Sequence, residues 1–356
     1  AVAFGFMLHV RKRDRQKYSE ACRPILGKYT DGILGRLIDL LAVFALLAGT
    51  ATTFSLATPL MASVIGELFH VELNRTVVTI IILVLTCVVY TYSLLHGFKG
   101  ISFLAKSCIY LFFGLLAYVF LFGGETKYII ETGFSAIGRV VQNFFQLATY
   151  TDPQRTTSFP QTWTIFYWAY WMVWCVATPF FIGNISRGRT VRQTIFGGYL
   201  FGCGSTIVSF IILGNYSLGQ QIAGAADYIA MYQKNGDLYS IIIAIIRTLP
   251  CAPLILALLF ITMVAFYATS FDSIALIGAC YSYHKLGENE SPHKLIELMW
   301  CVLLIALPIA LVFSDSSMSN LQSVSIIAAF PIAAVIVLIT FSFLKDAKKY
   351  LLETEK

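Results

Sequence analysis

Four of the five tryptophans of this chain fall within twelve residues, in the run Trp163-Thr-Ile-Phe-Tyr-Trp168-Ala-Tyr170-Trp171-Met-Val-Trp174. On a helix, spacings of three and four residues place such rings on one broad face. The faces of tryptophan and tyrosine rings attract cations, each by roughly 0.5 to 2 kcal/mol. A trimethylammonium group suits a cage of such rings, because it has no N–H to offer to a conventional acceptor. The run therefore predicts a site for a quaternary ammonium.

An interfacial belt is the alternative interpretation of the same rings, since Trp and Tyr also gather at the level of lipid headgroups. A belt is expected to be about one turn deep, whereas Trp163 to Trp174 covers about three turns at ~1.5 Å per residue. No Asp or Glu occurs between Asp152 and Asp227, so the helix carries no carboxylate partner for an ordinary ammonium. Spacing alone leaves both interpretations open.

The composition is that of an all-α polytopic membrane protein. The chain is 58% hydrophobic with a mean hydropathy of +0.75, and apolar runs of about 20 residues recur along it. Only 12% of the residues are charged, where a soluble domain has roughly 25%. The eight cysteines lie singly, without a Cys-x-x-Cys, so neither a disulfide framework nor a metal site is indicated.

The apolar runs predict eight complete spans after the partial one at residues 1–10, which has the character of the last turns of a helix already under way. We therefore expect that the chain begins inside a longer protein. The predicted spans lie at about 37–58, 76–97, 101–122, 163–184, 194–214, 252–282, 296–314 and 322–344.

Charge supports this topology, because 19 of the 25 Lys and Arg residues fall on the side predicted to be cytoplasmic. The chain is therefore expected to lie in the cell (plasma or inner) membrane as a multi-pass protein, with lipid as its surroundings. The net charge of +6 divides between the two sides and indicates no nucleic-acid partner.

Residues about 125–150 differ from the spans, because apolar side chains recur there at helical spacing among polar ones. This pattern predicts an amphipathic helix that lies in the outer interface.

Two groups of hydroxyl residues interrupt apolar spans. Thr269 and Ser270 lie together in the span at about 252–282, and Thr50 and Thr53 lie in a cluster within the span at about 37–58. Hydroxyl and carbonyl oxygens are hard ligands for an alkali cation. Hydroxyls that bond back to the preceding turn, or across helices, are the alternative.

The aromatic run, followed by Ile-Ser-Arg-Gly-Arg-Thr-Val-Arg192, resembles the signature of the betaine/carnitine/choline transporter family. The stretches Thr151-Asp152-Pro153 and Phe159-Pro160-Gln161 resemble its carnitine branch. The resemblance implies one transporter domain over 1–356, with the sodium-symporter-type fold of two inverted five-helix repeats. Its N-terminal helices would be absent from this chain, and its second repeat would be complete at about 163–344.

The resemblance implies a role for each ring of the run. Tyr170, Trp171 and Trp174 would contact the substrate. Trp168 would line its route, and Trp163 would form an outer, secondary site. Tyr170 stands where the family usually has Trp, which implies a different cage width or an added hydroxyl donor toward a carboxylate.

The resemblance also implies a sodium site at Phe266, Thr269 and Ser270, with further ligands from a helix that precedes this chain. A second sodium would lie near Thr50 and Thr53. However, Leu46 stands where a Thr is expected and Ala177 where an aromatic is expected, which weakens the second site.

Cys108 and Thr178 bear on the coupling. Sodium-independent carnitine exchangers would have an arginine in place of Cys108 and a methionine in place of Thr178. The absence of this arginine and this methionine favours a bound cation as the coupling partner. The sequence thus predicts a secondary transporter of glycine betaine, carnitine or choline by alternating access, coupled to Na⁺ and without another cofactor. The alternative is an ion-independent exchanger of carnitine or butyrobetaine. The resemblance also implies a homotrimer, and no pattern of catalytic residues indicates an enzyme.

Overall fold

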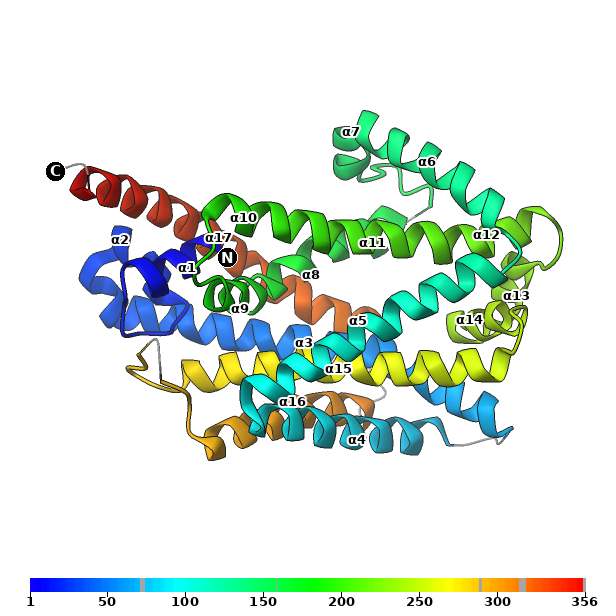
Figure 1. The fold of residues 1–356 in the computed structure, drawn as a ribbon, viewed down its shortest axis with the longest axis horizontal. Helices are drawn as coiled ribbons and strands as arrows, with labels where there is room; N and C mark the ends of the chain where they lie inside the picture. The colour runs from blue at the N-terminus through cyan, green and yellow to red at the C-terminus, as the bar shows by residue number, and fades with distance from the viewer. Residues whose placement is uncertain (71–73, 158, 288–289, 314–317, 355–356) are drawn as a thin grey trace.

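Helices make up all the regular structure of the described residues. A computed structural model describes residues 1–70, 74–157, 159–287, 290–313 and 318–354. The long helices are α3 (Ile33–Phe69), α4 (Arg75–Leu95), α5 (Gly97–Phe122), α6 (Thr126–Gln142), α15 (Ala252–Tyr281), α16 (Lys294–Phe313) and α17 (Met318–Thr354). Figure 1 shows most of them running lengthwise through the molecule.

Shorter elements connect or interrupt the long helices. Before α3 lie α1 (Val2–Gly5), η1 (Phe6–Val10), η2 (Ser19–Cys22), α2 (Arg23–Leu26) and η3 (Gly27–Asp31). The middle of the chain holds α7 (Phe144–Thr149), η4 (Pro160–Ile165), α8 (Phe166–Trp174) and α9 (Thr178–Ile185). A nearly continuous helix follows as α10 (Val191–Gly197), η5 (Gly198–Cys203), α11 (Gly204–Ser209), η6 (Phe210–Gly214) and α12 (Asn215–Ile222). The elements α13 (Tyr228–Asn235) and α14 (Leu238–Arg247) then lead to α15.

Helix α3 lies at the centre of the bundle and contacts α4, α8, α14, α15, α16 and α17. Its middle carries small buried residues: Ala42, Ala45, Ala48, Gly49 and Ala51. Small side chains allow neighbouring helices to approach closely, which is the usual basis of helix packing in membranes. The sequence of α3 therefore suits a helix that other helices surround.

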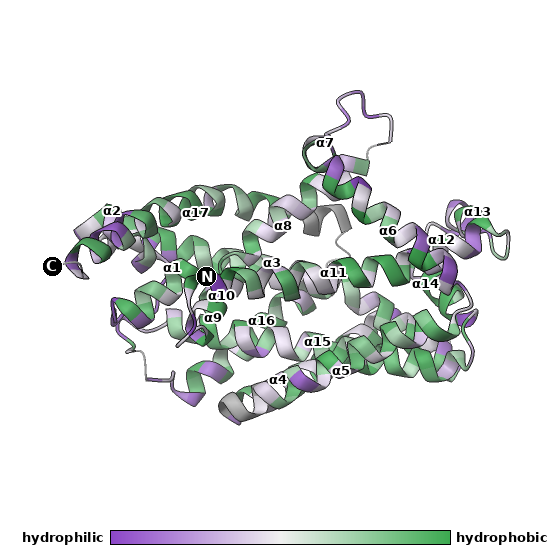
Figure 2. Ribbon diagram, turned by 45° about the horizontal axis from the view of Figure 1, so that its top comes forward, coloured by the Kyte–Doolittle hydropathy of each residue, from purple (hydrophilic) through white to green (hydrophobic). Residues whose placement is uncertain are grey.

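The apolar surface has the length and continuity that a membrane requires. Six helices of the described residues are long and apolar enough to cross it, and the bent pair of η4–α8 and α9 adds a seventh if it is one span. The expected all-helical polytopic architecture is thereby confirmed. The remaining predicted span, at about 296–314, coincides with α16, an apolar helix of 20 residues. Figure 2 shows hydrophilic residues gathered towards the two ends, near α2 and near α13.

The predicted helix at 125–150 consists of two helices that meet at Asn143. The Asn143 backbone has φ −111° and ψ 25°, which ends α6 before α7 begins. In Figure 1 both helices stand away from the main bundle, with α12 near the start of α6. Most apolar residues of this pair are exposed, including Phe134 and Phe145 at 75% and 80%. Only Ile129 and Gly133 of α6 are buried, and a place for this pair in the outer interface stays a prediction.

An ion network joins the segment after η1 to the C-terminal end of α17. The Arg11 guanidinium lies 2.9 Å from Asp346 and 2.8 Å from Glu353, and Arg13 also lies 2.8 Å from Asp346. The Asp346 side chain is only 11% exposed. Figure 1 shows the N-terminal elements and the end of α17 at the same end of the bundle. One carboxylate thus holds two arginines from the other end of the chain.

We expect Asp346→Asn to lower the stability of the protein by about 1 to 3 kcal/mol, because two arginines lose a shared, mostly buried charge partner. Thermal unfolding in detergent at low salt measures this loss. High salt should shrink the difference from the unsubstituted protein, since screening weakens ion pairs that only the unsubstituted protein has. Glu353→Gln is the control, and its effect should be smaller because Glu353 is 47% exposed. Equal unfolding midpoints for Asp346→Asn and the unsubstituted protein would contradict a stabilising network.

Candidate functional site

The aromatic run forms η4 and α8, and its rings divide between two faces. Trp168 and Trp171 are 54% and 60% exposed, whereas Trp163, Tyr170 and Trp174 are half-buried. The five residues predicted to handle substrate therefore do not converge on one enclosed pocket in the described chain. Tyr170 and Trp174 form an inner pair, Trp163 is an outer ring, and Trp168 and Trp171 form an exposed face.

Ring contacts define these groups. The Tyr170 and Trp174 rings meet edge to face, with centroids 6.1 Å apart and planes at 77°. The buried Phe166 stacks on Tyr170 at 5.4 Å. Trp163 stacks instead on Tyr167, at 6.1 Å. Edge-to-face pairs are a favoured arrangement for aromatic rings, so the inner pair has a defined geometry.

Thr53 of α3 joins the inner pair to the centre of the bundle. The Tyr170 and Thr53 hydroxyls form a hydrogen bond, and Thr53 Oγ1 also donates to the Gly49 carbonyl at 2.9 Å. From α15, the Tyr267 hydroxyl donates to the backbone carbonyl of Thr53 at 3.3 Å. Sequence reasoning missed Tyr267, because its partner lies 214 positions away and no local pattern marks the pair.

The aromatic helix does not run straight through the span predicted at about 163–184. It bends by 45° between Trp174 and Thr178. Pro179 has no backbone N–H, so the Cys175 carbonyl loses its helical partner. Two tyrosines from elsewhere in the fold supply donors: Tyr18 donates to the Cys175 carbonyl at 3.2 Å and Tyr281 to the Val176 carbonyl at 3.5 Å. The break is thus stabilised by its surroundings.

A small cavity lies beside the break, between α3 and α8. Its volume is about 10 Å³, close to the least that holds one water molecule, so it cannot contain a trimethylammonium group. Its lining residues are Ala45, Leu46, Gly49, Thr50, Val173, Trp174, Ala177 and Ile274. Thr50 donates to the Leu46 carbonyl at 2.6 Å, and neither Leu46 nor Ala177 offers a side-chain oxygen. The second sodium site at Thr50 and Thr53 stays a prediction, and Leu46 and Ala177 add no side-chain ligand to it.

The residues predicted to hold the first sodium all lie on α15, and two of them, Phe266 and Thr269, contact α5. The Thr269 hydroxyl donates to the Ala265 carbonyl at 2.8 Å, and the Cys108 thiol of α5 interacts with the Thr269 side chain. Phe266 meets Phe112 of α5 edge to face at 5.4 Å. Cys108, which stands where the exchangers would have an arginine, therefore lies beside a residue of the predicted sodium site.

Asp272 lies one turn further along α15 and is fully buried. Ser93 of α4 donates to one carboxylate oxygen at 2.9 Å, and Ser273 donates to the other at 3.0 Å. Ser273 also bonds to the Thr269 carbonyl at 3.2 Å. A hydroxyl thus lies within hydrogen-bond distance of each carboxylate oxygen of this buried acid, and the single hydrogen of Ser273 is shared between Asp272 and the Thr269 carbonyl. No group of three or more His, Cys, Asp or Glu residues suited to a metal ion occurs in the described part of the chain.

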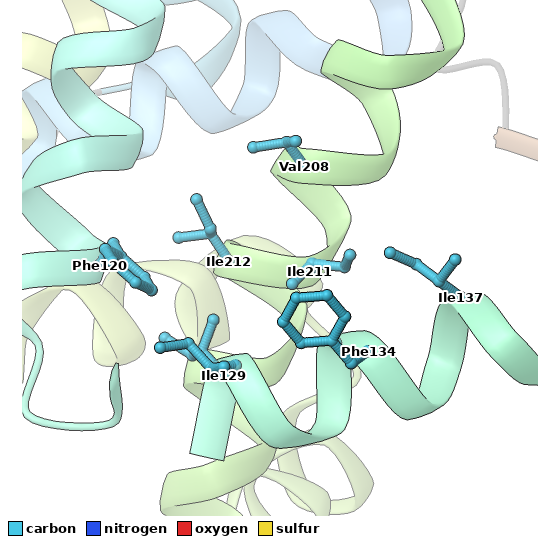
Figure 3. Close-up of a pocket in the computed structure, with 9 residues that line it drawn as sticks. Phe120, Ile129, Phe134, Ile137, Val208, Ile211 and Ile212 are labelled. Carbon is cyan, nitrogen blue, oxygen red and sulfur yellow. The ribbon is translucent and has the colours of Figure 1, made fainter. Parts of the chain in front are cut away.

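A larger cavity lies away from the aromatic helix, between α5, α6 and the α11–η6 segment. Its volume is about 220 Å³, and Figure 3 shows Phe120, Ile129, Phe134 and Ile211 directed around it. All of its lining residues are apolar or glycine. It offers no hydroxyl or charged group that would orient a zwitterion, so it is not the candidate substrate site.

Asp152 orders the loop that leads into η4. The Thr157 backbone N–H donates to its carboxylate at 3.0 Å, and so does the Thr156 hydroxyl, at 3.0 Å. These donors, the Thr157 N–H first, hold the pKa of Asp152 below its usual range. Gln161 then bonds to the Thr151 carbonyl at 2.6 Å, which ties η4 to the same loop. The spacing of Asp152 and Thr156 is a local signal that sequence reasoning could have used.

Together, the fold and this site define a class of protein. Apolar helices that cross a membrane surround a helix with several hydroxyl side chains, and a broken aromatic helix packs against it. Broken helices near hydroxyl-bearing partners are typical of secondary transporters. The described chain thus has the features of a polytopic membrane transporter.

Comparison with known sequences identifies the family. The sequence model described as "BCCT, betaine/carnitine/choline family transporter" matches residues 1–351. The chain therefore belongs to the betaine/carnitine/choline transporter family, as its aromatic run indicated. A carnitine transporter from Acinetobacter baumannii is 25% identical over 346 residues, which cover 97% of this chain. The chain spans 62% of the length of that relative.

The close approach of α3 and α8 at Gly49 gives a test of this geometry. A Cβ at Gly49 would lie 2.9 Å from Val173 Cγ1, and Val173 is buried. We expect Gly49→Ala to separate the two helices and to destabilise the protein by about 1 to 3 kcal/mol, as overpacking does. Gly138→Ala on α6 is the control, since nothing lies within 4 Å of a Cβ there. Thermal unfolding that shows no difference between the two variants would contradict the contact.

Proposed function

We propose that this chain forms part of a secondary transporter that moves a trimethylammonium compound, such as glycine betaine, carnitine or choline, by alternating access and with sodium coupling. The observation that carries the proposal is the aromatic surface of α8, whose sequence lacks any carboxylate. Ring faces attract a methylated ammonium that has no hydrogen to donate. An ordinary amine would instead favour a carboxylate or carbonyl partner.

The inner pair and the exposed face of α8 fit different steps of transport. Tyr170 and Trp174 are held by neighbours from α3, which suits a fixed binding surface. Trp168 and Trp171 present open ring faces, which suit capture of a cation that arrives from another part of the protein. The break after Trp174 supports alternating access, because a break lets the two halves of a span move separately.

Sodium coupling is supported by the position of Cys108 beside Thr269. A neutral thiol leaves the negative ends of hydroxyl and carbonyl dipoles unbalanced, which suits a bound cation. Under the same proposal the protein assembles as a homotrimer through the exposed apolar face of α6 and α7, as the resemblance implies.

Replacement of an exposed ring tests the aromatic surface. Trp171→Leu should weaken uptake of labelled betaine, carnitine and choline into proteoliposomes by roughly 2- to 30-fold in half-saturation, the value of one cation–ring contact. Trp171→Phe is the matched control and should retain most of the affinity, because it keeps a ring face. Equal uptake by the Leu and Phe variants would contradict an electrostatic role for the ring. Absence of uptake of every methylammonium by the unsubstituted protein would contradict the proposed function.

The same assay tests the coupling ion. Thr269→Ala should raise the sodium concentration for half-maximal uptake about tenfold or more, because one oxygen ligand is lost. Thr262→Ala is the control on the same helix, since its hydroxyl donates only one turn back, to the Leu258 carbonyl at 2.7 Å. Cys108→Arg should reduce the dependence on sodium, because a fixed positive charge would stand beside Thr269. Uptake that requires only substrate inside the vesicles, and no sodium gradient, would favour the exchanger instead.

A further inference from the structure

The hydrogen bonds around Thr53 can be counted atom by atom. A threonine hydroxyl has one hydrogen to donate and can accept at its oxygen. Thr53 donates that hydrogen to the Gly49 carbonyl at 2.9 Å. Both contacts are satisfied at once only if Thr53 accepts from Tyr170, so we assign the phenol of Tyr170 as the donor.

This direction fixes what the Tyr170 phenol can offer. Its only hydrogen points to α3, so it is committed and cannot also bind a substrate carboxylate. The Trp174 side chain interacts with the same phenol. The indole nitrogen of Trp174 faces α3, since a Cβ at Gly49 would lie 3.8 Å from Nε1. The expected hydroxyl donor toward a carboxylate is therefore not available in this arrangement.

The position of Thr53 is in turn fixed by α15. Tyr267 donates to the Thr53 carbonyl at 3.3 Å. The neighbouring Phe54 stacks on Phe271 with centroids 4.1 Å apart and planes at 16°. Phe54 and Phe271 are both almost fully buried. The α3 segment at Thr53 thus has little freedom to shift relative to α15.

Thr53 is also poorly placed to hold a cation. The small cavity that Thr50, Leu46 and Ala177 line does not include Thr53. Its hydroxyl already donates once and accepts once, and its carbonyl already accepts from Tyr267. A cation at this hydroxyl would have to displace the Tyr170 bond.

We propose that Thr53 is a positioning residue for the aromatic site, which fixes the Tyr170–Trp174 pair through the Tyr170 hydroxyl, and that it is not a sodium ligand. The role within substrate binding depends on the proposed function. The site consequently recognises the trimethylammonium end of its ligand, and Tyr170 does not distinguish ligands with a carboxylate from those without. Selection at the other end of the ligand falls to other residues.

Two properties of the purified full chain test this inference. The first is binding of betaine, carnitine and choline, followed by tryptophan fluorescence at saturating sodium. Thr53→Val removes the hydroxyl and keeps the shape of the side chain, and we expect it to weaken binding of all three ligands by a similar factor of about tenfold. Tyr170→Phe should have a similar effect. The double variant should be little worse than either single one, because both remove the same bond.

Two further variants separate positioning from general damage. Thr53→Ser keeps the hydroxyl and should restore binding to within about twofold of the unsubstituted protein. Thr86→Val is the control, since Thr86 is a fully buried threonine on α4 whose hydroxyl donates to the Ile82 carbonyl of its own helix at 2.8 Å. It should leave the affinities unchanged.

Three results would overturn the proposal. A loss in Thr53→Val confined to betaine and carnitine would mean that Tyr170 serves the carboxylate. A shift in sodium half-saturation, with unchanged ligand affinity at saturating sodium, would mean that Thr53 binds the cation. Additive losses in the double variant would mean that the two hydroxyls act separately.

The second property is thermal unfolding without ligand, which does not depend on the proposed function. The losses of stability in Thr53→Val and Tyr170→Phe should be non-additive in the double variant. If the unsubstituted protein binds no methylammonium, the proposed function fails, while non-additive unfolding still supports Thr53 as the residue that positions Tyr170. Additive unfolding would contradict that positioning as well.

Discussion

The constraint on which the rest of this structure depends is that polar groups inside a membrane must find their partners within the protein. Lipid offers no hydrogen bonds, so each freed carbonyl or hydroxyl is costly. The break between α8 and α9 meets this constraint with two tyrosine donors, Tyr18 and Tyr281, which lie before and after it in the sequence. The break can therefore lie deep in the fold, and its place determines where the aromatic helix ends.

The same constraint explains the hydroxyl side chains of α3. Thr50 and Thr53 both bond to the preceding turn, which satisfies their hydrogens. Only their oxygens are left to interact with other helices. Thr53 shares a hydrogen bond with the Tyr170 hydroxyl, and Thr52 shares one of 2.7 Å with Ser325 of α17. Small apolar residues let such a helix pack closely, and its few hydroxyls form hydrogen bonds with particular neighbouring helices.

The charged residues form ion pairs at the ends of the bundle. Asp346 pairs with Arg11 and Arg13 at one end, and Arg247 lies 2.6 Å from Glu67 at the other. These pairs join segments far apart in the sequence without placing charges among the spans. Between these ends the spans carry mainly rings and hydroxyls, together with the buried acid Asp272, which bonds to Ser93 and Ser273.

The sequence by itself determined the helical class and the family, because these depend on apolar run length and on the local run of aromatic residues. It also located every ring of the aromatic helix. It did not show the break after Trp174 or the end of α6 at Asn143. Only the tertiary structure decided which rings meet: Tyr170 pairs with Trp174, while Trp171 faces outward. It also decided that the hydroxyls of Tyr170 and Thr53 share a hydrogen bond and that Tyr267 reaches the same residue from α15. Periodicity assigns a side chain to a face of its helix, whereas its hydrogen-bond partner depends on which other helix that face meets.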